Sequence, residues 1–211
     1  MTYQLFYADR SAAQGVRVIL EEIDQDYRLI ETDIKSDRER SPELLAVNPN
    51  GLVPVLVFEE GAIYECGAIV TFLCDRHPEY QLAPAVSDPQ RGLFLQWLFF
   101  FSSALQNAFS MTYRPNRFAT LESAYPSVQQ QGCKRLLALW QVVDHAIADS
   151  LWMLGESFSA VDIYLFMLST WLSDDCGHPA LAEFANVMRV TDKVVKRPSV
   201  RKVYPSLCGA N

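Results

Sequence analysis

Residues 48–69 read NPNGLVPVLVFEEGAIYECGAI. Two short apolar runs, at 53–58 and 62–64, stand on either side of a glycine-containing turn, which predicts a β-hairpin. Pro54 stands near the start of the first run, where a residue without an N–H is tolerated, and the tight turn before it makes Pro54 a candidate for a cis peptide bond. Apolar residues recur at helical spacing directly after Glu65, so a helix should begin there with free N–H groups facing an anion. The stretch therefore predicts a cradle for an extended peptide that carries a carboxylate.

The order and separation of these signals are similar to those of a known family. NPxGxVPVL followed by E-x-x-A-I resembles the glutathione site of the cytosolic glutathione transferases, whose N-terminal domain has a thioredoxin-like fold. Either half alone would fit an ordinary hairpin or helix start, whereas both at this separation are specific. The resemblance implies that Val53, before a cis Pro54, pairs its backbone with the cysteinyl part of glutathione. It also implies that Glu65 and Cys66 hold the γ-glutamyl end and that Leu52 belongs to the same binding set.

The composition is that of a globular protein of 211 residues, 50% hydrophobic and 20% charged. No apolar run reaches the roughly 18 residues that a membrane span needs, and the first residues lack the pattern of a signal peptide. The five cysteines are scattered, without a C-x-x-C pair or a Cys/His ligand spacing, which argues against a disulfide framework and a zinc site. We therefore expect a cytoplasmic protein with reduced cysteines, no metal and no membrane partner.

The charge is distributed unevenly along the chain. Residues 1–80 carry 7 Lys/Arg against 15 Asp/Glu, a net charge of −8, and residues 81–211 carry 11 against 10, a net charge of +1. The acidic first part argues against nucleic-acid binding, which needs a basic face. It is also unfavourable for an anionic ligand such as glutathione, but local N–H groups and one arginine would outweigh a diffuse field at physiological salt.

Residues 1–80 show the order of elements of one small α/β domain. Residues 3–7 predict a strand, Ser11 fits the N-cap of a following helix, and residues 27–32 predict a second strand, parallel to the first. A short helix is expected from Pro42 onward, then the hairpin, then a helix from Cys66 to about residue 75. This βαβ–α–ββα order is the thioredoxin-like fold as glutathione transferases use it.

Residues 81–87 predict a linker, and strand signals stop beyond it. Long helices are expected at 90–113 and at about 129–150, so residues 88–211 predict an all-α domain, which in the family forms the hydrophobic substrate pocket. The helix at 90–113 is apolar on more than one face, which indicates burial on several sides or an interface. The family is usually homodimeric, and 99–101 is the patch that we expect at such an interface.

A capping box is expected at the start of a later helix. Ser159 and Asp162 have the required spacing before an apolar run, and G-x-x-x-S-x-x-D resembles the capping motif of the transferase helical domain. We interpret both as folding residues and not as catalytic ones.

Conjugation requires a thiolate, whereas a free thiol has a pKa of about 8.5, so the site must supply donors or positive charge. The first strand–helix junction is the expected place. Ser11 is a candidate donor to the sulfur, Tyr7 resembles the tyrosine that ends the first strand in many transferases, and Arg10 would add fixed positive charge. The alternatives are that Ser11 only caps the helix, that Tyr7 only packs, and that Arg10 is an exposed loop residue.

The activating residues depart from the family pattern. The cysteine of beta-type enzymes falls on Arg10, and the serine of serine-type classes falls on the same position, one residue before Ser11. Leu52 replaces a polar residue, and Cys66 stands where serine or glycine is usual. A thiol at a helix start is a candidate for glutathionylation, although a buried thiol in place of a hydroxyl is the alternative.

The second substrate is expected to be a small hydrophobic electrophile. Gln106, which stands where beta-type proteins have a histidine, together with Phe109 and Tyr113 lies near the family's electrophile pocket, although residues at such spacing are often core. The sequence thus predicts a glutathione transferase-like enzyme of a bacterial, beta-like type that serves in detoxification. Two alternatives stay open: a glutathione-binding carrier, sensor or interaction module with little activity, and another glutathione-dependent reaction such as peroxide reduction, dehalogenation or isomerisation.

Overall fold

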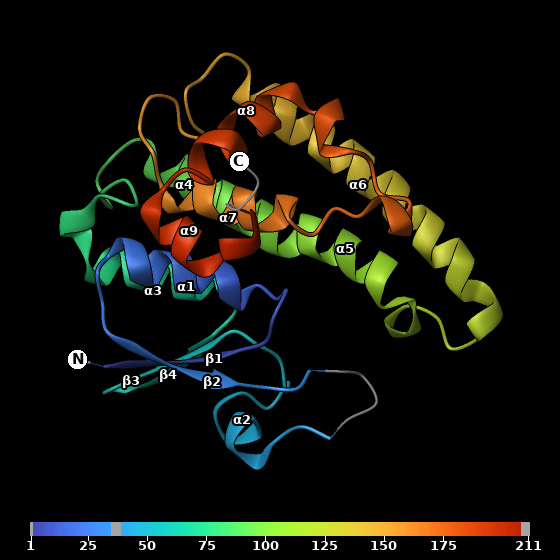
Figure 1. Cartoon of the computed structure of the whole chain (residues 1–211), viewed down its shortest axis with the longest axis horizontal. Coiled ribbons are helices and arrows are strands. Elements are labelled where there is room, and N and C mark those ends of the chain that lie inside the picture. Colours follow the sequence, from blue (N-terminus) through green and yellow to red (C-terminus); the bar gives the residue numbers. More distant parts are fainter. Residues whose placement is uncertain (1, 35–38, 208–211) are drawn as a thin grey trace. The chain divides into compact units, whose positions relative to one another are not determined.

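The structure is a computed structural model that describes residues 2–34 and 39–207. The chain divides into two compact units (Figure 1). The first unit comprises residues 1–86 and 195–211, and the second comprises residues 87–194. Each unit is described by itself below.

A four-stranded mixed sheet forms the centre of the first unit. Its strands are β1 (Tyr3–Tyr7), β2 (Tyr27–Glu31), β3 (Val55–Phe58) and β4 (Gly61–Tyr64), in the order β2-β1-β3-β4. β1 runs parallel to β2 and antiparallel to β3, and β3 pairs with β4 as an antiparallel hairpin. The hairpin and the parallel βαβ unit that the sequence predicts are therefore both present.

Helices cover both faces of this sheet. α1 (Ala13–Glu22) and α3 (Cys66–Arg76) lie side by side on one face, and α2 (Pro42–Val47) lies on the other (Figure 1). Most apolar residues of β1 and α1 and the inward-facing ones of β3 and α3 are buried, so the core lies between the sheet and these helices. The fold is the expected thioredoxin-like domain, and the helix after the hairpin begins at Cys66 as predicted.

The end of the chain belongs to the first unit, where α9 (Pro198–Val203) packs against α1. Arg197 donates from Nε and Nη2 to the two carboxylate oxygens of Glu22, at 2.6 and 2.7 Å. The hydroxyl of Ser199 donates to the same carboxylate. The sequence predicts one domain for residues 88–211, whereas the described residues from Val195 onward group with the first unit, and the pair of Arg197 with Glu22 is one of their contacts with α1.

Replacement of Glu22 tests this attachment. Glu22→Ala is expected to lower the free energy of unfolding by about 2–3 kcal/mol, because it removes the acceptor of two charge-assisted bonds and one hydroxyl bond. Lys202→Ala is the matched control and should cost much less, since the Lys202 side chain is 67% exposed and exposed ion pairs contribute little to stability. Chemical denaturation of both variants measures the difference, and equal losses would contradict the ranking.

The second unit consists of helices. They are α4 (Arg91–Phe99), a π-helical segment (Phe100–Leu105), α5 (Gln106–Tyr113), α6 (Tyr125–Ile147), α7 (Ala160–Ser169) and α8 (Ala185–Val194). α5 and α6 run side by side (Figure 1), and every residue of α7 is buried. Short 3-10 turns of this unit lie at Pro115–Arg117, Glu122–Ala124, Asp174–Cys176 and Leu181–Glu183. The first unit has two further 3-10 turns, at Pro78–Tyr80 and Pro205–Leu207.

The long helix expected at 90–113 contains a π-helical segment. A π turn leaves a main-chain carbonyl without its usual partner. Here the carbonyl of Phe99 accepts hydrogen bonds from the hydroxyls of Ser102 and Ser103, at 3.3 and 2.7 Å. Helical periodicity predicts the helix but contains no signal for this insertion.

The aromatic patch at 99–101 needs correction. Phe99 is 67% exposed, but Phe101 is fully buried. The ring of Phe101 lies 5.9 Å from that of Trp97 and 5.7 Å from that of Tyr164. Phe99 and Phe101 differ in exposure because residues two apart on a helix point in different directions. Only Phe99 remains as a strongly exposed member of the patch.

Candidate functional site

Val53 and Pro54 stand between α2 and β3, and the peptide bond that joins them is cis. Val53 precedes the paired residues of β3, so its backbone is outside the ladders with β1 and β4. The side chain of Asn48 holds the turn before it: its Nδ2 donates to the carbonyl of Leu52 at 2.9 Å. Leu52 itself is exposed. The turn therefore presents the main chain of Val53 directly before β3, outside the hydrogen-bonded ladders of the sheet.

Asn48 shapes the turn before Val53, although no role was predicted for it from the motif. It is buried, and its Oδ1 also accepts a hydrogen bond from the amide of Asn50 at 3.1 Å. The signal that could have found it is its place in NPNG, because asparagine side chains commonly bond the backbone two residues on in a turn.

Glu65 occupies the N-cap position of α3 with a left-handed backbone, at φ 73° and ψ 118°. Such a conformation costs a non-glycine residue of order 1–3 kcal/mol and is found mainly at functional sites. The carboxylate is exposed, and it makes no hydrogen bond or ion pair with any other residue that the structure describes. A free carboxylate thus stands at the start of α3, where the first N–H groups of a helix have no partner within the helix itself.

Cys66 is 4% exposed, and its thiol donates to the carbonyl of Ala12 at 3.6 Å. The burial favours the interpretation of Cys66 as a packed thiol over that of a reactive one. Because Ala12 is the N-cap residue of α1, the contact also brings the start of α3 to the first strand–helix junction. The expected glutathione-binding residues and the expected activating residues therefore lie in one region of the first unit.

Ser11 is buried in the turn between β1 and α1. Its hydroxyl donates to the carbonyl of Ala8 at 2.7 Å and accepts a bond from the amide of Ala13 at 3.3 Å. The hydrogen that the sequence analysis assigned to the glutathione sulfur is thus already used within the turn. α1 also begins later than a Ser11 cap would place it, with Ala12 at the N-cap.

Tyr7 and Arg10 flank this turn. Tyr7 ends β1 and is half-buried, and its carbonyl accepts a bond from the amide of Thr32 at 2.8 Å. Arg10 is exposed with a left-handed φ of 52°, and its guanidinium has no hydrogen-bond or ion-pair partner among residues 2–34 and 39–207. The junction therefore contains the phenol of Tyr7 and the guanidinium of Arg10, which has no ion-pair partner among the described residues.

The residues expected to contact the electrophile are on α5 in the second unit. Gln106 accepts a hydrogen bond from the hydroxyl of Tyr164 at 3.0 Å. Phe109 is 1% exposed and packs edge-on against Trp171 and His178, so its expected role in an open pocket is not supported. Tyr113 is exposed, with its hydroxyl bonded to the carbonyl of Trp171. Of the two aromatic residues, only Tyr113 has a ring that is accessible to a substrate.

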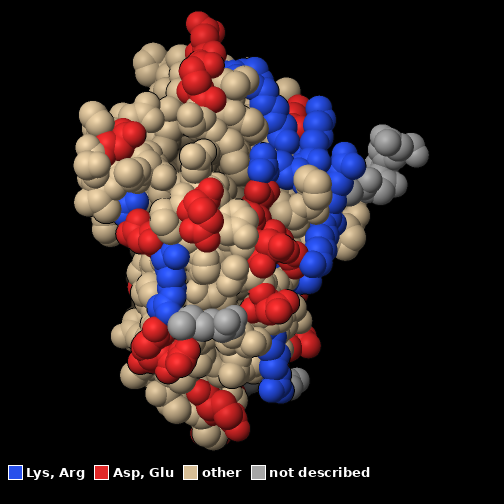
Figure 2. Space-filling view, turned by 90° about the vertical axis from the view of Figure 1, so that its left-hand side faces the viewer, with Lys and Arg blue, Asp and Glu red and all other residues tan. Residues whose placement is uncertain are grey.

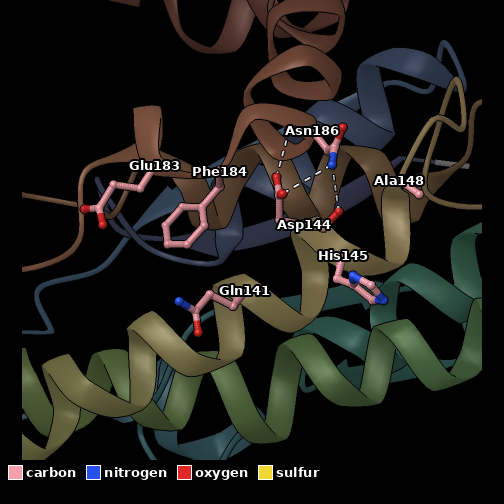
Figure 3. Close-up of a pocket in the computed structure, with 7 residues that line it drawn as sticks. All are labelled: Gln141, Asp144, His145, Ala148, Glu183, Phe184 and Asn186. Carbon is pink, nitrogen blue, oxygen red and sulfur yellow. Dashed lines mark hydrogen bonds between the residues drawn. The ribbon is translucent and has the colours of Figure 1, made fainter.

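The second unit contains a shallow hollow of about 400 Å³ at the end of α6 and the start of α8. Figure 3 shows that its residues come from the end of α6, from the segment that leads into α8 and from the first turn of α8. Asp144 accepts bonds from the amides of Asn186 and Val187, at 2.7 and 3.0 Å, and so caps α8. None of the site residues predicted from the sequence lines this hollow, and both of its carboxylates, Asp144 and Glu183, accept hydrogen bonds from nearby main-chain amides.

Ala148, at the rim of this hollow, has φ 43° and ψ −127°, a region that favours glycine. Ala148→Gly is expected to raise the free energy of unfolding by about 1 kcal/mol. Ala146→Gly, at an exposed position inside α6, should lower it by a similar amount, because glycine is unfavourable within a helix. Denaturation curves of both variants measure the two signs, and a loss of stability in Ala148→Gly would contradict the argument.

On the face shown in Figure 2, many Lys and Arg side chains gather at the upper right, and Asp and Glu side chains are spread over the rest of the view. The described residues contain no cluster of three or more His, Cys, Asp or Glu side chains that could hold a metal ion. Over the same residues, no helix is both long and apolar enough to cross a bilayer.

Comparison with known proteins gives consistent relatives. A family model described as the N-terminal domain of glutathione S-transferase matches residues 5–81. Glutathione S-transferase GstA from Escherichia coli O157:H7 is 32% identical over 170 residues, which cover 80% of this chain and 81% of the relative. Disulfide-bond oxidoreductase YfcG from Escherichia coli K12 is 27% identical and covers 75% of each chain. A Sulfitobacter glutathione transferase homologue with bound glutathione superposes with a TM-score of 0.88 at 25% identity, over 97% of this chain and 98% of that one.

Proposed function

The chain belongs to the glutathione S-transferase family, and we propose that it binds glutathione in its first unit and adds the glutathione thiolate to a small hydrophobic electrophile. The observation that carries the proposal is the strained, unpartnered Glu65 at the start of α3. A residue that keeps an unfavourable backbone conformation and an unpaired carboxylate is typical of a ligand-binding site, so we assign the Glu65 carboxylate to a ligand.

In this proposal the cradle holds glutathione at two places. The Glu65 carboxylate accepts hydrogen bonds from the ammonium of the γ-glutamyl end, and the N–H groups that open α3 bind the carboxylate of the same end. The main chain of Val53, outside the sheet ladders, pairs with the cysteinyl part. Pro54, Leu52 and the buried Cys66 shape the walls of this cradle.

Activation of the thiol is assigned to the junction before α1. The Arg10 cation and the start of α1 favour the thiolate electrostatically, and the Tyr7 phenol is the donor whose hydrogen is not used by another described residue. Ser11 keeps the turn in shape through its bond to Ala8. The gain comes from a lowered thiol pKa and from the proximity of the two substrates.

The remaining parts of the proposal concern the second substrate and the setting. Tyr113 and Gln106 are its proposed contacts on α5, and Phe109 supports them from the core. We propose a cytoplasmic homodimer that serves in detoxification.

Calorimetry with reduced glutathione, paired with a chloronitrobenzene conjugation assay, tests the function. Binding together with turnover supports a transferase, whereas the absence of binding would remove the proposal. Binding without turnover would favour the second candidate, a glutathione-binding module, which is motivated by Arg10 at the activating position and by the engaged hydroxyl of Ser11. A peroxidase assay and a disulfide-reduction assay test whether the protein catalyses a different glutathione-dependent reaction. Disulfide reduction is tested because one relative is a disulfide-bond oxidoreductase.

Three variants separate the candidate activating residues. Arg10→Gln and Tyr7→Phe are each expected to lower kcat at least about tenfold, because each removes about 1.4 kcal/mol or more of thiolate stabilisation. Ser11→Ala should lower kcat less and should lower the free energy of unfolding by about 1 kcal/mol, since its hydroxyl bonds the turn. The thiol pKa of bound glutathione, measured by ultraviolet absorbance against pH, should rise in Arg10→Gln. A larger loss of kcat in Ser11→Ala, with unchanged stability, would instead return the donor role to Ser11.

A further inference from the structure

Two cysteines of the second unit lie against each other although they are 43 residues apart. Cys133 is on α6, and Cys176 ends the 3-10 turn Asp174–Cys176. The Cys133 thiol donates to the main-chain carbonyl of Cys176, with 3.4 Å between sulfur and oxygen. A Cβ atom built on Gly177 would lie 4.0 Å from the same sulfur. The Cys133 sulfur thus touches the short backbone segment that carries the second thiol.

The contact between the Cys133 sulfur and the Cys176 carbonyl brings together two cysteines that are distant in sequence, which is the first requirement for a disulfide. Such a bond needs Cβ atoms about 3.5–4.5 Å apart, and cysteines on distant or opposed backbones cannot form it. Cys133 is half-buried, whereas Cys176 is exposed at the end of a short turn, so its side chain is accessible to a reagent. Gly177 follows with φ +69°, a conformation that glycine adopts without strain.

We propose that Cys133 and Cys176 form a reversible disulfide by exchange with a low-molecular-weight disulfide such as glutathione disulfide. First, the Cys176 thiolate attacks one sulfur of glutathione disulfide, the S–S bond breaks and one glutathione thiolate leaves. Then the Cys133 thiolate attacks the Cys176 sulfur of the mixed disulfide, and the second glutathione thiolate leaves. Two protein thiols are oxidised, their two protons pass by way of solvent to the two departing glutathione thiolates, and one glutathione disulfide is reduced to two glutathione molecules.

The order of the two steps follows from the surroundings of each thiol. Burial, together with the neighbouring Cys176, raises the pKa of the Cys133 thiol, so less of it is thiolate at neutral pH. The exposed Cys176 therefore reacts first, and Cys133 resolves the mixed disulfide. The bond ties α6 to the segment between α7 and α8, which restricts the unfolded chain and stabilises the fold.

The test uses the full chain, treated with glutathione disulfide, then alkylated in denaturant and mapped by mass spectrometry. We expect two fewer alkylated thiols and a linked pair of peptides that contain Cys133 and Cys176. The Tm should rise by roughly 5 °C or more. Excess reduced glutathione should restore both thiols and the original Tm.

Variants define the pair. Cys133→Ser should accumulate a glutathione adduct on Cys176, Cys176→Ser should form no link, and Cys74→Ala should still link because Cys74 is a buried residue of the other unit. A stable glutathione adduct on Cys176 in the unmodified sequence, a link that involves another cysteine, or no reaction would each overturn the proposal. The peptide map of the unmodified sequence decides the question even where a variant fails to fold. Its result is independent of glutathione binding in the first unit.

Discussion

Asp162→Ala is expected to lower the free energy of unfolding by about 3–5 kcal/mol, a large fraction of the 5–15 kcal/mol of a typical domain. Asp162 is fully buried at the start of α7. Its carboxylate accepts hydrogen bonds from the amides of Met153 and Ser159, each at 2.8 Å, and from the Ser159 hydroxyl at 3.1 Å. Alanine would leave these buried donors without an acceptor, and each would cost about 1–3 kcal/mol.

Chemical denaturation followed by circular dichroism measures the loss. Asp149→Ala is the control, because Asp149 is exposed in the same unit and its replacement should change stability by less than about 0.5 kcal/mol. A loss in Asp162→Ala no larger than that of the control would contradict the role of Asp162 as the cap of α7.

The neutral replacement Asp162→Asn adds a dependence on pH. Burial raises the pKa of Asp162 from 3.8 to about 6, although the hydrogen bonds to its carboxylate oppose the shift. The folded protein therefore holds this proton more tightly than the unfolded chain, and the stabilisation is present below pH 4 and is lost as the pH rises through 6. Asp162→Asn should accordingly cost much less than Asp162→Ala, and its cost should shrink between pH 4.5 and pH 7. A cost that grows over this interval would contradict the raised pKa.

The parts of the fold that the sequence predicts are those with local signals. The EEG turn between two apolar runs indicates the hairpin, Pro54 indicates the cis bond, and helical spacing after Glu65 indicates α3. The attachment of residues 195–211 to the first unit could not be predicted in this way. It depends on Arg197 and Glu22, which are 175 residues apart, and no local pattern pairs them.

The candidate site shows the same division. The motif predicts which residues form the cradle, but it contains no information on where a hydroxyl hydrogen points. Ser11 has the right residue type at the junction, yet its donor is taken by the carbonyl of Ala8. Phe109 has the helical spacing of a pocket residue, yet the rings of Trp171 and His178, which follow it by more than sixty residues, enclose it. Residue type and spacing predict which residues lie near the site. Contacts with residues distant in the sequence determine whether each of those residues can reach a substrate.

Glu65→Gly is expected to make the protein more stable and to weaken its binding of glutathione by roughly 10–100-fold. The stabilisation should be about 1 kcal/mol, because glycine adopts the φ of 73° at position 65 without the penalty that glutamate bears. The weaker binding follows from the loss of the charge-assisted bonds proposed for the γ-glutamyl ammonium, which are worth about 1.5–3 kcal/mol. Calorimetry with reduced glutathione and chemical denaturation measure the two effects on the same variant.

Two controls separate backbone strain from ligand contact. Asp24→Gly relieves another left-handed residue, at φ 48° in an exposed turn, so it should add stability and leave glutathione affinity unchanged. Glu65→Gln keeps the strain and removes the charge, so it should weaken binding and leave stability unchanged. If Glu65→Gly gains stability and binds glutathione as tightly as the unmodified sequence, the strained residue has no ligand to explain it and the proposed cradle fails. If affinity falls without any gain in stability, the carboxylate contact stands, but the conformation at Glu65 has no measurable cost.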